Sequence, residues 1–204
     1  MVNIKTIFNK GVLFSGLLFS TMTHALYLTG NEVYTLEGND DNIETYDTSA
    51  LTMDSFSGSA SVNAYNHSTI NVSTIGSISH FTTHNNSTAN IFDGNFSFIN
   101  VLDNSQANVY GIGVTSWFVI SSDAHLTVFG ENLMYQNGHV SGIGSSGYHF
   151  GFDVKKADEF GRIIEGTPTN VTLSSVPLPA SLLLFLSGGF TLFAKINLNN
   201  RKKS

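Results

Sequence analysis

The 204-residue chain has no cysteine, and it has neither lysine nor arginine between Leu26 and Val154. Without cysteine, packing and hydrogen bonds alone must hold the fold together. Without cations along most of its length, the chain has little with which to neutralise phosphate groups, which argues against nucleic acid as a partner. The same absence argues against recognition of an anionic polysaccharide through basic side chains.

Most of the cations lie at the two ends of the chain, whereas all 15 acidic residues lie between Glu32 and Glu165. The cations at the ends are Lys5, Lys10, Lys195, Arg201, Lys202 and Lys203. Between the ends only Lys155, Lys156 and Arg162 remain, so three cations against 15 carboxylates give this part a net charge of −12. A large negative charge favours solubility outside the cell.

The N-terminus has the features of a secretory signal peptide at residues 1–25. Lys5 and Lys10 precede a short apolar stretch at residues 11–19, and Thr23-His24-Ala25 places small residues where signal peptidase requires them. We therefore expect signal peptidase to cut between Ala25 and Leu26. The alternative is an N-terminal membrane helix, but about ten apolar residues are too few to span a bilayer.

The C-terminus at residues 176–204 has three parts in a fixed order: a proline motif, an apolar stretch and a basic tail. The motif is Val176-Pro177-Leu178-Pro179-Ala180, and the apolar stretch continues to residue 194. The prolines favour an extended segment, the apolar stretch can enter a bilayer, and the cations hold its end at the cytoplasmic side. This order resembles the PEP-CTERM sorting signal of exported bacterial surface proteins, in its VPLPA-type variant.

The resemblance implies a route to the cell surface. In that family an exosortase, a membrane-embedded cysteine transpeptidase, is thought to cut near the proline motif after the C-terminal segment has anchored the protein transiently in the inner membrane. The setting it implies is exopolysaccharide production and biofilm. The alternative is an ordinary C-terminal membrane anchor that is never cut.

The middle of the chain is an internal repeat with steps of 19, 19, 18 and 19 residues between equivalent positions. Each copy alternates apolar and polar residues around a polar turn that ends in a small residue, which predicts two strands joined by a turn. A partial copy begins at Glu32, and a third short strand is expected around Ile75, Ile78, Phe96, Phe98 and Trp117. The five copies occupy residues 43–53, 62–72, 81–91, 99–109 and 118–128.

One such unit cannot bury its apolar face alone, whereas stacked copies bury a continuous core. We therefore predict an all-β fold, a short parallel β-helix or β-solenoid of about five 18–19-residue coils at residues 26–130. A β-sandwich is the alternative. The apolar positions should point inward and the polar position of the second strand outward. Stacking then predicts an outward polar ladder of Thr52, Asn71, Asn90, Asn108 and Thr127.

The repeat fades after Gly130, and residues 131–175 are expected to form a β-rich cap. A Gly-rich composition, a hairpin at Asn137-Gly138 and a final strand near residues 170–173 are its predicted features. An atypical end of this kind covers the edge strand that a solenoid otherwise leaves exposed.

Candidate catalytic and metal-binding residues are few. Asp47 and Asp103 share a turn position but lie three coils apart, roughly 14 Å from the strand spacing, which exceeds the ~5–9.5 Å between paired glycosidase carboxylates. Asp103 and Asp123 lie one coil apart and are the best remaining pair.

No metal or cofactor is expected. His67, His80 and His84 lie on strands or turns without the helical spacing of a zinc motif. Asp40 and Asp41 offer oxygen ligands suited to Ca²⁺, but they lack the spacing of a calcium loop, and a turn with two solvated carboxylates explains them better.

These observations favour an exported, non-enzymatic structural or adhesive protein at the cell surface or in the extracellular matrix. Its expected partners are signal peptidase, an exosortase-type transpeptidase, the membrane during sorting and an exopolysaccharide. The alternative function is a carbohydrate-active enzyme, a polysaccharide lyase or glycosidase, on a β-helix scaffold.

Overall fold

The computed structural model describes residues 25–38, 42–56, 59–113, 115–158 and 160–175, and within these ranges it contains thirteen β-strands and no helix. The strands are β1 (Ala25–Leu28), β2 (Val33–Gly38), β3 (Asn42–Thr45), β4 (Ala50–Phe56), β5 (Ser59–Ala64), β6 (Thr69–Thr83), β7 (Thr88–Val101), β8 (Gln106–Val109), β9 (Thr115–Ile120), β10 (His125–Gln136), β11 (His139–Ile143), β12 (His149–Lys156) and β13 (Val171–Ser175).

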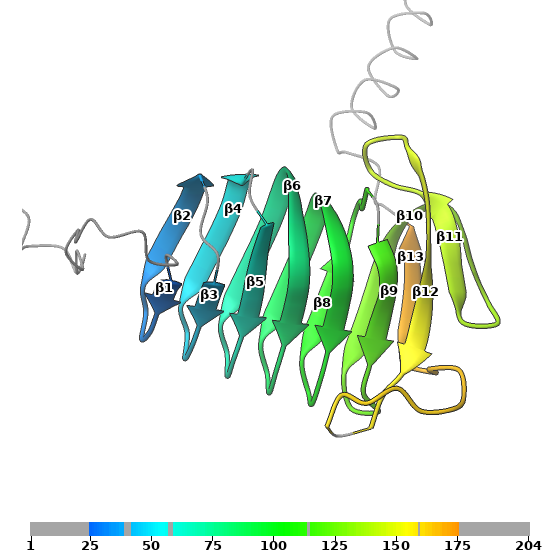
Figure 1. Cartoon of the computed structure of the whole chain (residues 1–204). Helices are drawn as coiled ribbons and strands as arrows, with labels where there is room; N and C mark the ends of the chain where they lie inside the picture. Colours follow the sequence, from blue (N-terminus) through cyan, green and yellow to red (C-terminus); the bar gives the residue numbers. More distant parts are fainter. Residues whose placement is uncertain (1–24, 39–41, 57–58, 114, 159, 176–204) are drawn as a thin grey trace, which may run out of the picture.

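Two columns of parallel strands build a rod, and the chain visits them in turn (Figure 1). One column contains β1, β3, β5, β9, β12 and the later halves of β6 and β7. The other contains β2, β4, β8, β10, β13 and the earlier halves of β6 and β7. Strands one repeat apart pair in parallel, as Ile43 does with Val62. The predicted β-solenoid is therefore confirmed, and the β-sandwich alternative is wrong.

All five predicted copies stack in order, and each end of the rod carries a further pair of strands. The partial copy at Glu32 becomes β2, whose Val33 pairs with Ala50 of the next coil. At the other end β12 pairs in parallel with β9, and β13 pairs in parallel with β10. Strand β10 runs across residue 130, so the chain passes from the repeats into the cap without a break.

The inward positions predicted from the alternation form the core, and each of them is fully buried. Two are threonines whose hydroxyls bond inside the rod: Thr45 donates to the Ser68 hydroxyl at 3.0 Å, and the Thr83 hydroxyl lies 2.8 Å from that of Ser105. The others are Ile43, Leu51, Met53, Val62, Ala64, Ile70, Val72, Phe81, Ala89, Ile91, Ile99, Val101, Ala107, Val109, Phe118, Ile120, Leu126 and Val128.

The predicted third strand is wrong, because its residues belong to the strands already described. The register shifts at Ser73 bend β6 without ending it, so the strand turns the corner and continues into the next coil. Ile78 and Phe96 are buried on these continuous strands. Phe98 and Trp117 are partly exposed, and their rings pack together with centroids 5.0 Å apart.

The opposite corner of each coil is a tight turn with one residue in the left-handed region. Asp47, Asn66, Asn85 and Asp103 occupy it with φ of 58°, 60°, 57° and 56°. Asparagine and aspartate tolerate this conformation better than other residues with a side chain. A buried serine follows two positions later, and its hydroxyl donates to a turn carbonyl, as Ser87 does to His84 at 2.8 Å. The small residue of the repeat is therefore a corner residue that must fit under the turn.

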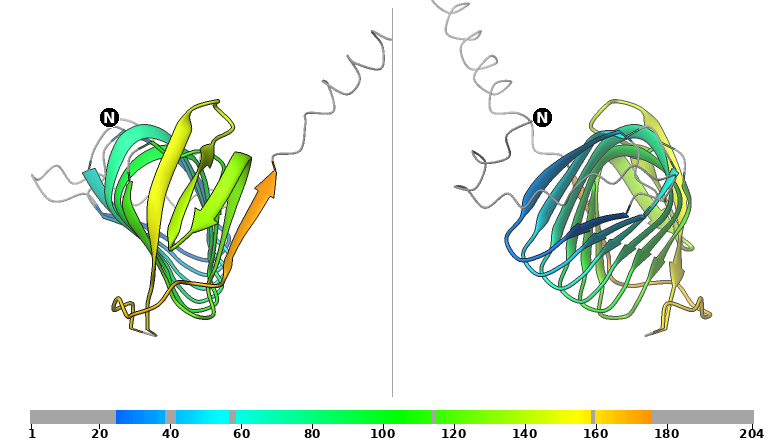
Figure 2. Two further views of the ribbon diagram at one scale, coloured as in Figure 1. Left: turned by 90° about the vertical axis from the view of Figure 1, so that its right-hand side faces the viewer. Right: turned by 60° about the vertical axis from the view of Figure 1, so that its left-hand side comes forward.

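Antiparallel strands cap one of the two columns at the C-terminal end of the rod (Figure 2). Strand β11 pairs with the later half of β10 on one side and with β12 on the other. The hairpin lies at Asn137-Gly138 as expected, with φ of 53° and 79°, which suits a two-residue loop. The final strand lies at β13, where the Asn170 carbonyl accepts from the Leu126 N–H at 3.1 Å.

The register of the core predicts that aspartate at residue 70 and aspartate at residue 71 differ sharply in their effect on thermal stability. Ile70→Asp should unfold the rod, because an unpaired carboxylate in the core costs several kcal/mol. Asn71→Asp should melt close to the wild type, because residue 71 points outward and the carboxylate keeps the acceptor that Asn90 uses. Thermal unfolding followed by circular dichroism measures both. Equal melting temperatures for Ile70→Asp and the wild type would show that the inward register is wrong.

Candidate functional site

The outward polar ladder runs along the β2 column of strands. Thr52, Asn71, Asn90, Asn108 and Thr127 pair in register from coil to coil. The Asn90 amide donates to the Asn71 Oδ1 at 2.9 Å, and the Asn108 amide donates to the Asn90 Oδ1 at 2.9 Å. These side chains are half-buried, so the amides hold neighbouring coils together and still present polar atoms to solvent.

A ladder of aromatic rings runs beside the amides on the same column. The Phe92 and Tyr110 rings stack at 4.9 Å and 12°, and the Tyr110 and Phe129 rings stack at 4.4 Å and 6°. Phe92 stands at the end of this row and is 44% exposed. Amides beside aromatic rings suit the polar and apolar faces of neutral sugars. This face therefore offers amide groups and aromatic ring surface side by side.

A second aromatic ladder lies at the turns and ends at His84, which lies beside a carboxylate. The rings of Tyr27, Tyr46, Tyr65 and His84 follow one another with centroids 4.7–4.9 Å apart. Burial raises the pKa of Tyr46 above its ordinary value, and a hydrogen bond to Glu44 at 3.0 Å adds to the effect. His84 in turn lies 3.4 Å from the carboxylate of Asp103.

The candidate catalytic carboxylates serve the turns. Asp47 accepts from the Gly30 N–H at 3.1 Å, and Asp103 accepts from the Asn85 N–H at 3.1 Å. Between these two carboxylates lie Asn66 and Asn85, whose amides continue the same column from coil to coil. Asp123 stands one position further along its turn than Asp103 does, so this pair does not share a column. These contacts favour a structural role for Asp47 and Asp103.

The three candidate histidines have different surroundings. His80 packs its ring against Phe98 at 5.5 Å, whereas His84 stacks on Tyr65. His67 lies in the neighbouring turn and is exposed. Within the part of the chain that the structure describes, no three His, Asp or Glu side chains are grouped as a metal site.

Two of the cations near the C-terminus have specific contacts. The Lys155 ammonium lies 4.4 Å from the centroid of the Trp117 ring, a cation–π geometry. The Arg162 Nε donates to Asp158 at 2.7 Å. The pKa of Asp158 is held below its ordinary value, chiefly by the hydrogen bond from the Arg162 backbone N–H.

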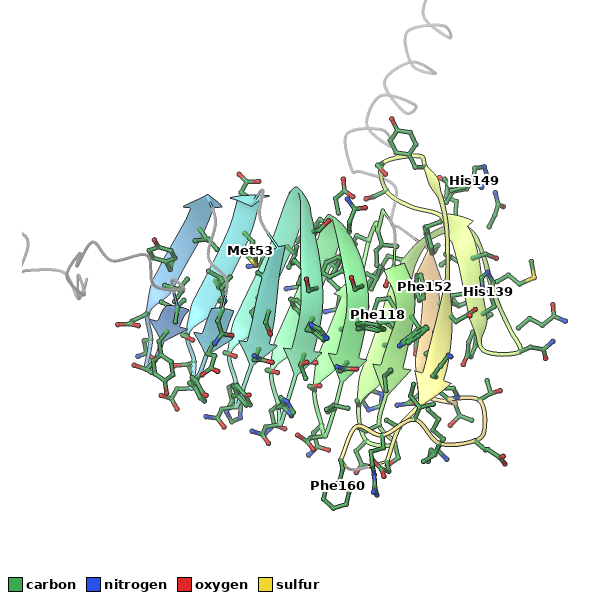
Figure 3. The ribbon with its side chains drawn as sticks, in the orientation of Figure 1. Met53, Phe118, His139, His149, Phe152 and Phe160 are labelled. Atoms are coloured by element: carbon green, nitrogen blue, oxygen red, sulfur yellow. The ribbon has the colours of Figure 1, made fainter. Side chains whose placement is uncertain are left out.

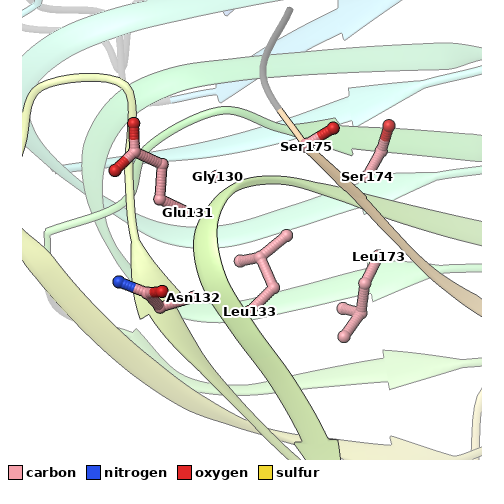
Figure 4. Close-up of a pocket in the computed structure, with 7 residues that line it drawn as sticks. All are labelled: Gly130, Glu131, Asn132, Leu133, Leu173, Ser174 and Ser175. Atoms are coloured by element: carbon pink, nitrogen blue, oxygen red, sulfur yellow. The ribbon is translucent and has the colours of Figure 1, made fainter.

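A shallow hollow between β10 and β13 lies close to the last described residue (Figure 4). Leu133, Leu173, Glu131 and Ser175 are among the residues that line it. Glu131 is the one titratable side chain among the residues that line it, so the hollow does not bring two candidate catalytic groups together.

Several predicted residues lie outside the described ranges. These are the sorting motif Val176-Pro177-Leu178-Pro179-Ala180, the segment before the cut at Ala25 and Leu26, and Asp40 and Asp41. Ala25 and Leu26 themselves begin β1. No helix in the described part of the chain is both long and apolar enough to cross a bilayer.

The fold and its outward ladders define a parallel β-solenoid. Comparison with protein-family models, with curated proteins and with solved structures found no match for this chain.

The aromatic ladders were missed from the sequence, although a signal for one of them was present. Tyr46, Tyr65 and His84 each precede the left-handed turn residue by one position, so an alignment on the turn places them in one column. Phe92 is harder to place, because the register shift beside it breaks the simple alternation.

The amide ladder predicts a measurable loss of stability on truncation. Asn90→Ala removes two amide–amide hydrogen bonds, which should lower the free energy of unfolding by about 1–2 kcal/mol. Asn104→Ala at an exposed turn position is the control and should leave stability nearly unchanged. Urea unfolding measures the difference. Equal stability of the two variants would mean that the amide contacts contribute nothing to the stacking.

Proposed function

We propose that this protein is an exported surface or extracellular-matrix protein that an exosortase releases from its membrane anchor. The observation that carries the proposal is the order of proline motif, apolar stretch and basic tail directly after the last strand of a β-solenoid. Its role is structural or adhesive, and it requires neither cofactor nor metal. The exopolysaccharide of the producing cell is its proposed partner.

The shape of the rod supports a contact function. A solenoid exposes whole columns of equivalent side chains, so one weak contact is repeated along the rod (Figure 3). The amide ladder through Asn90 and the aromatic ladder through Tyr110 lie on one such face. Repetition raises the total affinity for a repetitive polymer without requiring a deep pocket.

The absence of lysine and arginine from Leu26 to Val154 fits a neutral rather than an anionic glycan. A negatively charged surface repels polyanions at low ionic strength, and added salt screens this repulsion. Neutral sugars need only hydrogen-bonding groups and aromatic rings, and the outward ladders supply both.

Processing at the proline motif predicts a shortened surface protein. The released chain should lack residues 182–204, and replacing Pro177 and Pro179 with Ala should leave an uncut, membrane-retained chain. Pro168→Ala is the matched control, because this proline lies outside the motif and its carbonyl acceptor for Tyr135 is retained. Mass spectrometry of surface and membrane fractions reads both ends of the chain. If the full-length chain is the only species with or without the prolines, the segment is a simple anchor.

A contact function also predicts no turnover of glycans. The protein released by cells should liberate no reducing ends or unsaturated sugars from the producing organism's exopolysaccharide, with or without Ca²⁺. Asp103 and Asp123 are the residues at which to test this expectation, with the exposed Asp54 as the matched control. Turnover that disappears in Asp103→Asn or Asp123→Asn but persists in Asp54→Asn would establish a glycan-cleaving enzyme instead.

A further inference from the structure

The two ends of the rod differ in how their outermost strands are paired. At the C-terminal end β12 pairs with β9 on one side and with β11 on the other, so the end of that column is covered (Figure 2). At the N-terminal end, among the described residues, β1 pairs only with β3 and β2 pairs only with β4. The first coil therefore presents two open strand edges.

The open edges have backbone groups that no described strand uses. The Glu32 carbonyl accepts from the Ala50 N–H at 2.8 Å, so the backbone of Glu32 faces β4. Backbone groups alternate sides along a strand, which directs the N–H groups of Val33 and Thr35 away from β4. Unpaired edges of this kind are templates for another strand.

Large apolar side chains gather on the same coil. Val33 is 81% exposed, Tyr27 58% and Tyr34 43%. Tyr34 pairs with Leu51, which is fully buried, so Tyr34 belongs to a core column. It is 43% exposed because no described strand lies beyond β2. A partner that extended the stack would cover this ring and pair the free edges together.

We propose that two copies of this chain associate end to end through β1 and β2, in a two-fold dimer. The predicted cut after Ala25 removes the upstream segment of the same chain, so that segment does not occupy the open edges and a second copy does. In this respect the dimer rests on the proposed export. A two-fold axis across the rod places each edge strand antiparallel to its own counterpart, so both edges pair at once. Head-to-tail stacking could pair only one of the two columns, because β11 covers β12 whereas β13 has β10 as its only partner among the described strands. The two-fold arrangement pairs both edges of the first coil and closes as a dimer.

The strong negative charge of the chain opposes this association. Salt screens the repulsion between the two copies, whereas the edge hydrogen bonds and the covered apolar side chains depend on it much less. The dimer should therefore strengthen as ionic strength rises.

Sedimentation equilibrium of the exported protein tests the dimer directly, once mass spectrometry has verified that the chain begins at Leu26. At micromolar concentration the wild type should have twice the mass of one chain. Thr35→Pro removes an N–H that faces the open edge and should give a monomer with an unchanged circular dichroism spectrum. Thr35→Ala keeps the N–H and should remain a dimer.

Val33→Asp provides a second test that leaves the backbone intact, because it adds a carboxylate from each copy to an already negative interface and weakens association without touching the core. A wild-type chain that begins at Leu26 and stays monomeric overturns the dimer and leaves export standing. A chain that keeps residues 1–25 overturns both proposals. A dimer that survives Thr35→Pro and Val33→Asp unchanged would place the interface elsewhere and would also contradict the proposal.

Discussion

Parallel, in-register stacking at a repeat of 18–19 residues is the constraint on which the rest of the structure depends. Each side chain lies directly above and below its equivalents, so every position must suit a neighbour of similar kind. Asparagine meets this demand because its amide both donates and accepts, as Asn90 does between Asn71 and Asn108. Aromatic rings meet it by stacking, and aliphatic residues meet it by packing in the core.

The same constraint explains how a chain with so many carboxylates stacks at all. Like charges directly opposite one another on adjacent strands destabilise a sheet. In the turn column, Asn66 and Asn85 separate Asp47 from Asp103. On the outward face of the other column, Glu44 pairs with Asn63 rather than with another carboxylate. In these two columns Asp47, Asp103 and Glu44 thus lie next to neutral amide side chains in the neighbouring coil.

The strand alternation and the constant period were sufficient to predict the solenoid, its inward residues and the polar ladder. They could not place Phe98 and Trp117, because a bulge that bends a strand and a turn that ends it look alike in a Ser-rich segment. The path of β12 and β13 was also hidden, since the Gly-rich residues after 130 no longer repeat. What the outward faces bind depends on a partner surface, and repetition alone does not identify it.

Interstrand nuclear Overhauser contacts in an isotope-labelled sample test the stacking most directly. Parallel pairing predicts that the backbone of residue 71 contacts residues 52 and 90, each one repeat away. It also predicts no close Hα–Hα contacts between strands of residues 42–128, because such contacts mark antiparallel neighbours. Contacts of residue 71 with positions that are not one repeat away, or Hα–Hα contacts within that range, would contradict the stacked solenoid.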